Sequence, residues 1–434
     1  MSRAARRTPR QPQVSMERTG HAALHADTRD RVAAPAPTPG LYVRRLHLTA
    51  FRNYAHAELH GDGRPVVLTG PNGAGKTNLL EAVSFLAPGR GLRRAGLSEV
   101  ERHPGAQGRG QGADAQADAP VPAQQPWAVA ARVITPDGPR DLGTGRDPTA
   151  DGRERRAVKI DGDFAGSQQA LGEIVAVTWL TPQMDRLFQD SPGGRRRFVD
   201  RLVYGIDPAH AGRVNAYEHA LRERARLLRG DRAPDPAWLG VLEQRMAERG
   251  VAIAAARRQL IDRLASASAS GGGPFPKADL GLAGDLETWF DELSALDAEE
   301  KMTAALQQAR GRDADTGGAA YGPHRADLVA RHVARDLPAE LCSTGEQKAL
   351  LISIVLAHAR LLTAERGFAP LVLLDEVAAH LDAERRAALF DELVALGAQP
   401  WLTGTDPELF AGLQGRAQFF EVQAARIKPV TPAT

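Results

Sequence analysis

The eight residues from Gly70 to Thr77 constrain this chain more than any other stretch. They match the pattern Gly-x-x-x-x-Gly-Lys-Ser/Thr at every fixed position. Such a loop needs glycine because its backbone N–H groups turn inward around a phosphate, in conformations that a Cβ would obstruct. The apolar stretch 65–69 predicts a short buried strand and 78–83 predicts a helix. We therefore expect a phosphate-binding loop at a helix N-terminus, where the helix dipole favours an anion.

The end of this loop carries its chemistry. Lys76 would reach the β- and γ-phosphates of a nucleotide, and the Thr77 hydroxyl would ligate Mg²⁺. Only six of the 55 basic residues are Lys, and one stands here, where a compact ammonium suits the site better than a planar guanidinium. The alternative is a Gly-rich turn between a strand and a helix. The residues expected to contact ATP are Gly70, Pro71, Asn72, Gly73, Ala74, Gly75, Lys76, Thr77 and Asn78.

Composition excludes several classes of protein. The 434 residues are 43% hydrophobic and 25% charged, which is typical of a soluble globular chain with room for two or three domains. No apolar run approaches the ~18 residues of a membrane span. The single Cys342 excludes an intramolecular disulfide. A cytoplasmic protein without a membrane partner is therefore expected.

Charge is concentrated at the start of the chain. Residues 1–40 carry seven Arg against Glu17, Asp27 and Asp30, so the remainder holds two more acidic than basic residues. Any nucleic-acid-binding surface must then be a local patch. The first 40 residues lack apolar periodicity and predict a disordered extension, with the real start codon near residue 41. An Arg-rich transit peptide is the alternative.

Periodicity predicts an α/β lobe interrupted by a helical insertion. We expect strands at 42–51, 128–134, 156–160, 174–180, 372–375 and 400–403. We expect helices at 208–229, 236–268, 349–362 and from 383, with one or two more within 285–310. Helices 208–229 and 236–268 would form an antiparallel hairpin. We expect an extension at 1–40, an ATPase lobe formed by 41–190 and 319–425, a helical lobe at 191–318 between its two parts, and a tail at 426–434. A low-complexity loop is expected at 104–126, within the first part of the ATPase lobe.

Two acids end the apolar run 371–374. At the carboxyl end of a strand beside a phosphate loop, Asp375 can hold Mg²⁺ and Glu376 can polarise a water that attacks the γ-phosphate. An acid at the end of an apolar run also arises by chance.

A second helix start carries a possible phosphate contact. Ser343 with Glu346 three residues on predicts a capping box at the start of helix 349–362. In the functional interpretation, the same helix N-terminus presents Ser343, Gly345 and its amides to a phosphate.

Together these motifs resemble the ATP-binding-cassette superfamily. The features are the phosphate loop, the Ser-x-Gly-x-Gln signature at 343–347, the acid-tipped strand and His380-Leu381-Asp382. Three segments narrow the resemblance to the RecF family of bacterial DNA replication and repair proteins. Residues 43–54 resemble its first strand, 182–200 its link into the helical lobe, and 321–328 its return strand. The fold it implies is α/β: a P-loop NTPase head lobe of the ATP-binding-cassette type with an antiparallel β subdomain and an inserted α-helical lobe.

The resemblance also implies an ATP-dependent homodimer, in which the signature of one subunit closes on the γ-phosphate held by the other. Gln183 would contact metal and water, with a surface Gln as the alternative, and Glu346 stands where a Gln is common. By position, Lys76, Asp375 and Glu376 are catalytic, with Glu376 as the base, and Thr77 and Asp375 bind Mg²⁺. Ser343 and Gly345 act in trans, Gln347 contacts the nucleotide, and Asp382 lies in the loop that crosses the interface.

The family further implies a role in recombinational repair and replication restart. Its members would bind double-stranded DNA at single-strand gaps, hydrolyse ATP slowly with DNA stimulation, and help load RecA together with RecR. No base-reading motif is visible, so binding should depend on DNA structure and salt. Three basic clusters are candidates for contacts with DNA phosphates. They are 195–197, Arg222 with Arg224, Arg226 and Arg229, and Arg257 with Arg258 and Arg263. For each cluster the alternative is a solvated helix surface.

Three other classes fit parts of the pattern. The ATP-binding subunit of a membrane transporter is disfavoured because Thr405 stands in place of a switch His and because the signature lies far from the loop. A fragment of a chromosome-structuring ATPase would need far longer coiled-coil arms. A nucleotide-gated scaffold without hydrolysis fits poorly with the presence of both Asp375 and Glu376.

Overall fold

The computed structural model describes residues 40–102, 126–147, 155–230, 234–269 and 273–431. The chain divides into a unit of residues 1–35 and a unit of residues 36–434, and all described residues belong to the second. The extension expected at 1–40 and the low-complexity loop expected at 104–126 lie almost entirely outside the described ranges.

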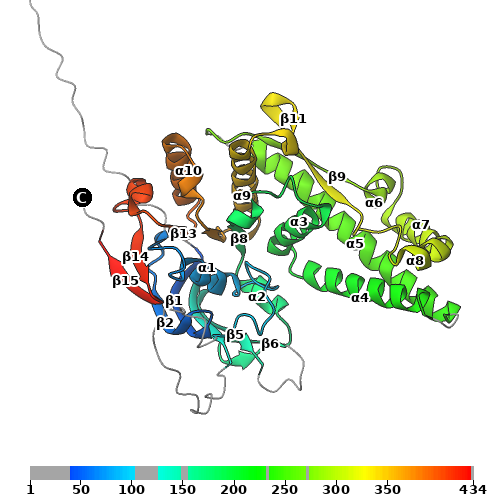
Figure 1. The fold of residues 1–434 in the computed structure, drawn as a ribbon, viewed down its shortest axis with the longest axis horizontal. Helices are drawn as coiled ribbons and strands as arrows, with labels where there is room; N and C mark the ends of the chain where they lie inside the picture. Colours follow the sequence, from blue (N-terminus) through cyan, green and yellow to red (C-terminus); the bar gives the residue numbers. More distant parts are fainter. Residues whose placement is uncertain (1–39, 103–125, 148–154, 231–233, 270–272, 432–434) are drawn as a thin grey trace, which may run out of the picture. The chain divides into compact units, whose positions relative to one another are not determined.

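A mainly parallel sheet forms the centre of the nucleotide lobe (Figure 1). Its strand order is β15-β14-β3-β13-β12-β8, with β15 as an antiparallel edge. Because β3, β13, β12 and β8 run parallel, their carboxyl ends share one edge of the sheet. The strands are β3 Val66–Thr69, β8 Val177–Leu180, β12 Leu371–Leu374, β13 Pro400–Gly404, β14 Gln418–Gln423 and β15 Arg426–Val430.

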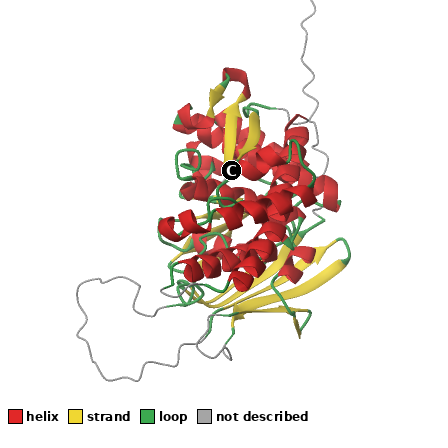
Figure 2. Ribbon diagram, turned by 90° about the vertical axis from the view of Figure 1, so that its right-hand side faces the viewer, coloured by secondary structure: helices red, strands yellow, loops and turns green. Residues whose placement is uncertain are grey.

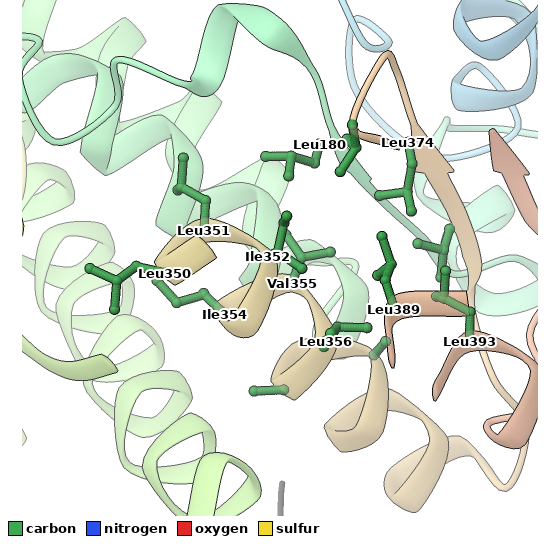
Figure 3. Close-up of a cluster of buried hydrophobic side chains, with 14 of the residues drawn as sticks. Leu180, Leu350, Leu351, Ile352, Ile354, Val355, Leu356, Leu374, Leu389 and Leu393 are labelled. Carbon is green, nitrogen blue, oxygen red and sulfur yellow. The ribbon is translucent and has the colours of Figure 1, made fainter. Parts of the chain in front are cut away.

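Alternation along these strands separates two hydrophobic cores. Val372 and Leu374 face one core and Leu371 and Leu373 face the other, as period-two geometry requires. The first core packs against α9 (Thr344–Arg366) and α10 (Ala383–Ala395). Figure 3 shows α9 side chains gathered with Leu180, Leu374, Leu389 and Leu393. The second core packs against α1 (Lys76–Ser84) and the antiparallel sheet.

The antiparallel sheet has six strands in the order β2-β1-β4-β5-β6-β7, and its long strands lie to one side of the helices in Figure 2. The expected strands at 42–51, 128–134 and 156–160 are confirmed, but β5 was not predicted. Gly143 and Gly145 interrupt its apolar pattern, so its sequence gave no alternation. The strands are β1 Tyr42–Phe51, β2 Tyr54–His60, β4 Ala128–Thr135, β5 Gly138–Arg146, β6 Arg156–Ile160 and β7 Asp163–Phe164.

A helical region surrounds a third core. The expected pair of long helices is present, with α4 and α5 packed side by side (Figure 1). Helices α6, α7 and α8 occupy the stretch where one or two were expected. The bounds are α3 Pro192–Ile206, α4 His210–Leu228, α5 Pro236–Ala269, α6 Asp285–Trp289, α7 Ala295–Gln308 and α8 Arg310–Thr316.

Several expected boundaries are wrong. The strand expected at 174–180 begins at Val177, because α2 (Gln169–Ile174) precedes it. The strand expected at 321–328 is β10 (Asp327–His332), which pairs with the unpredicted β9 (Ala278–Ala283) and with β11 (Leu337–Pro338) in a separate three-stranded sheet. Part of the expected tail forms β15, which pairs with β14 although Pro429 within it argues against a strand.

Helix α9 runs through the first core. By length and composition alone it would suffice to cross a membrane, and it is the one such helix in the described part of the chain. Its most apolar window is 78% buried inside the protein, as expected for a core helix. The capping box predicted for it is present, with Ser343 as N-cap and Glu346 at the third position.

Candidate nucleotide-binding site

The phosphate loop joins β3 to α1 at the carboxyl edge of the parallel sheet, and packing requires its glycines. Gly70 has φ +144°, and a Cβ there would lie 2.1 Å from the carbonyl oxygen of Val422. Gly75 has φ +117°, and its Cβ would lie 2.6 Å from both the Asn53 amide and the Tyr54 hydroxyl. No side chain caps the first turn of α1, so this helix start is free to bind an anion.

Lys76 lies buried against the loop that it would serve. Its Nζ donates hydrogen bonds to the carbonyl oxygens of Gly70, at 2.6 Å, and Pro71, at 3.0 Å. Burial lowers the pKa of the Lys76 ammonium, an effect that the nearby Glu376 and Asp375 carboxylates partly offset. The ammonium is thus placed at the mouth of the loop with only carbonyl dipoles as direct partners.

Thr77 and Asp375 meet as the sequence predicted, although 298 positions separate them. The Thr77 hydroxyl donates to Asp375 Oδ1 at 2.9 Å. The Thr403 hydroxyl donates to the same oxygen at 2.7 Å and accepts from the Glu376 amide at 2.9 Å. Asp375 is 5% exposed, and Glu376 has φ +54°, a strained conformation for a residue with a Cβ. Thr403 therefore holds both acids in position.

A polar network beneath the loop fixes the start of α1. Asn53 donates to the Ala74 carbonyl at 3.1 Å and accepts from the Asn78 amide at 2.7 Å. Arg93 donates to Asn78 at 2.6 Å. Arg52 forms a two-bonded pair with the fully buried Glu81 at 2.8 and 2.6 Å. Asn78, predicted to contact nucleotide, is thus engaged within the protein.

Gln183 lies beside the carboxyl edge of the parallel sheet. It is an exposed residue of the short 3-10 turn Pro182–Met184 that follows β8. Because β8 pairs with β12, this turn lies next to the strand end that carries Asp375. Two residues on, Asp185 accepts a hydrogen bond at 3.2 Å from Lys348, a buried residue of α9. The turn is thereby tied to the helix that carries the signature.

The signature residues are placed elsewhere. Figure 1 shows α1 well apart from β11, the short strand that precedes the start of α9. Ser343 and Gly345 are exposed, and a Cβ at Gly345 would meet nothing within 4 Å. The Ser343 hydroxyl and amide both donate to Glu346 at 2.9 Å, and Arg335 pairs with Glu346 at 2.8 Å. Those hydrogen bonds, aided by the Arg335 charge, lower the pKa of Glu346.

Two predicted contact residues have structural partners. Gln347 is fully buried, and its amide donates to the Cys342 carbonyl at 2.9 Å, so it holds the signature loop rather than facing solvent. Asp382 is exposed and caps α10, where its carboxylate accepts from the Arg385 amide at 2.8 Å.

Several arginines considered for DNA contacts are used inside the protein. Arg224 is 1% exposed and pairs with Glu243 and Asp313, and Arg257 is 4% exposed and pairs with Asp200. Those two predictions are wrong because the acidic partners come from distant segments. Arg195 forms two hydrogen bonds of 2.7 Å to Asp327.

Sequence reasoning missed Thr403 and Asn53. A threonine at the end of the apolar strand 400–403 was a usable signal, because that strand lies beside the acid-tipped one in the sheet. The donor set fits a Mg²⁺-nucleotide. A hydroxyl and one carboxylate are the few protein ligands that Mg²⁺ usually takes when phosphate oxygens and water complete its coordination. Among the described residues no cluster of three His, Cys, Asp or Glu offers such a cage.

The sequence matches the family described as "RecF/RecN/SMC N terminal domain" over residues 42–424. Its relatives include the DNA replication and repair protein RecF of Mesorhizobium japonicum, 47% identical over 92% of this chain and 100% of the relative. RecF of Brucella suis is 48% identical over 89% of this chain and 95% of the relative. The chain belongs to the RecF family. It is therefore a member of a family of DNA replication and repair proteins.

Solved structures agree on the fold. A structure of the recombination mediator protein RecF-ATPrS has a TM-score of 0.75 at 20% identity, covering 91% of this chain and 99% of that one. A RecF-ATP structure has a TM-score of 0.71 at 20% identity, covering 90% and 100%. The α/β P-loop head of the ATP-binding-cassette type, expected from the sequence of this RecF-family chain, is confirmed.

Proposed function

We propose that this RecF-family protein is an ATP-driven switch: ATP joins two copies head to head, and slow hydrolysis separates them. The observation that supports this most is the meeting of Lys76, Thr77 and Asp375 at one edge of the sheet, directly after a glycine loop. The structural neighbours described as RecF-ATP and RecF-ATPrS agree with ATP as the ligand.

In the proposed complex, Lys76 exchanges its two carbonyl partners for phosphate oxygens. Its ammonium is already buried, so little further desolvation opposes this exchange. An anionic phosphate oxygen also attracts the ammonium more strongly than a neutral carbonyl oxygen does. Thr77 and Asp375, with Gln183 beside them, would hold Mg²⁺. When bound, the metal neutralises charge on the phosphates.

Glu376 is the proposed base. It directly follows Asp375 at the end of β12, and the Thr403 hydroxyl fixes its amide. Its strained backbone is the kind of feature that persists where the surroundings hold a functional group in place. In this role its carboxylate orients the water that attacks the γ-phosphate and accepts its proton.

The exposed signature would complete the site of a second copy. Ser343 and Gly345 lie at the N-terminus of the 23-residue helix α9, where the helix dipole suits a phosphate. The phosphate loop of the same chain lies elsewhere (Figure 1), so the phosphate that reaches Ser343 would come from a partner. Asp382, at the start of α10, is proposed to lie in the loop that crosses this interface.

The proposed target is double-stranded DNA next to single-strand gaps, with RecR as a protein partner and support of recombinase loading as the outcome. Membership of the RecF family supports this target, as does a structural neighbour described as a recombination mediator protein in the RecFOR pathway. Since several arginines are internal, binding would rely on surface arginines such as Arg197 and fall steeply with salt.

Sedimentation of the purified chain tests this proposal. With Mg²⁺ and ATP the mass should double, and the dimer should co-sediment with gapped duplex DNA at low salt more than at moderate salt. A chain that binds ATP, stays monomeric and does not bind DNA would contradict the proposed switch.

A further inference from the structure

Exposed apolar side chains gather beside the signature. The described residues include nine large apolar side chains that are exposed, and four of them fall between 329 and 341. These four are Val329 at 45%, Val333 at 53%, Leu337 at 37% and Leu341 at 68% exposed. We call them the β10–β11 patch. A concentration of this kind marks an interaction site more often than scattered surface leucines do.

The patch is rigidly presented. Along β10, Leu328 and Ala330 face the first core, so alternation places Val329 on the outer face. Strand β10 pairs with β9 over its whole length and with β11 at its end. Leu341 ends the short 3-10 turn Ala339–Leu341 and stands two residues before Ser343. The apolar side chains therefore belong to the same framework that fixes the signature.

We propose that the β10–β11 patch is the apolar part of the contact with a second copy of this chain. The inference rests on the proposed function, in which Ser343 meets a phosphate held by another subunit. A partner subunit that brings a phosphate to Ser343 must also contact Leu341, because only Cys342 separates the two residues in sequence. In Figure 1 the strand β11, which carries Leu337, lies above α9 and away from α1.

The surroundings fit a protein–protein contact. Arg335 lies between Val333 and Leu337 in sequence and pairs with Glu346 at 2.8 Å. That pair gives the patch a polar rim joined to Ser343, since Glu346 accepts both the Ser343 hydroxyl and amide. Apolar centres with polar rims are typical of interfaces between proteins, whereas a DNA backbone would favour uncompensated cations. Covering this pair would strengthen its hold on the signature serine.

The helical region supplies a matched control. Leu296 is 66% exposed, close to Leu341 at 68%, and it lines a groove of about 620 Å³ between α5 and α7. The groove also contains Glu248, Glu299 and Glu300, and no Lys or Arg is among its lining residues. Leu296→Asp thus introduces the same change at equal exposure, far along the chain from the signature.

The test compares Leu341→Asp, Val333→Asp and Leu296→Asp with the wild-type chain in sedimentation with Mg²⁺ and ATP. A two-fold contact buries each apolar side chain twice, so Leu341→Asp should weaken the ATP-dependent dimer by roughly tenfold or more. Val333→Asp should act in the same direction, and Leu296→Asp should leave the dimer unchanged. Binding of ATP to the monomer and thermal melting should match wild type in all three variants, because the side chains are exposed.

The outcomes separate the two proposals. A wild-type chain that stays monomeric with ATP refutes the proposed switch itself. A wild-type dimer that both Leu341→Asp and Val333→Asp form equally well refutes only the β10–β11 patch. Equal loss with Leu296→Asp would assign the contact to the α5–α7 groove and also overturn the inference.

Discussion

The carboxyl edge of the parallel sheet and the N-terminus of α9 are the two phosphate sites that we propose at helix starts, and they differ in how complete they are. At the sheet edge, Lys76, Thr77 and Asp375 already have protein partners within 3.0 Å. At α9, Ser343 is exposed, and its hydroxyl is engaged only with its own capping box. The first site is preorganised for a ligand, and the second has a helix dipole but lacks the remaining ligand groups.

That difference suggests where a switch would act. A preorganised loop binds nucleotide without waiting for another subunit, because little further ordering is needed. In the proposed switch, the signature would gain a phosphate only when a second copy arrives, so dimerisation rather than nucleotide binding would be the conditional step. The two regions are joined within one chain by Asp185 and Lys348.

The largest expected effect is on turnover, at the sheet edge. Glu376→Gln should slow ATP hydrolysis by about a hundredfold to ten-thousandfold, because the proposed base loses its ability to accept a proton. The ATP-bound dimer should then persist, since binding is intact. Single-turnover hydrolysis and sedimentation measure the two effects, with Glu384→Gln on exposed α10 as the control. Wild-type turnover in Glu376→Gln would remove this residue from the base role.

The second-largest effect should be on the affinity for ATP. Lys76→Ala removes the charge-assisted bonds proposed to phosphate, worth about 2–3 kcal/mol, so ATP should bind roughly a hundredfold more weakly. Titration calorimetry measures this, and Lys428→Ala at the exposed edge strand β15 serves as the control. Unchanged affinity would show that the loop is not the ATP site.

The sequence foretold the sheet edge better than the rest of the molecule. The phosphate loop and the acid-tipped strand are local patterns whose meeting follows from parallel topology, so Thr77 and Asp375 could be paired in advance. Strand β5 was missed because glycines interrupt it, and β15 because it is short and contains Pro429. The burial of Arg224 was not visible, since Glu243 and Asp313 reach it only through tertiary packing.

The smallest effect should come from the link between the two regions. Lys348→Met leaves Asp185 without its partner and should weaken ATP-dependent dimerisation by a few-fold, about 1 kcal/mol, with ATP affinity unchanged. Lys348→Arg should recover most of the loss. Sedimentation and calorimetry on the same samples separate positioning from binding. If ATP affinity falls as much as dimerisation, the pair supports the fold rather than the coupling.

The central claim is that one working site combines the loop of one copy with the signature of another. Mixing Lys76→Ala with Ser343→Arg tests it directly, because neither variant alone should hydrolyse ATP, yet the mixed dimer holds one intact pairing. We predict that ATP hydrolysis returns in the mixture, approaching a quarter to a half of wild-type activity, in about the proportion of mixed dimers. A mixture as inactive as its separate components, with mixed dimers shown by sedimentation, would contradict the account.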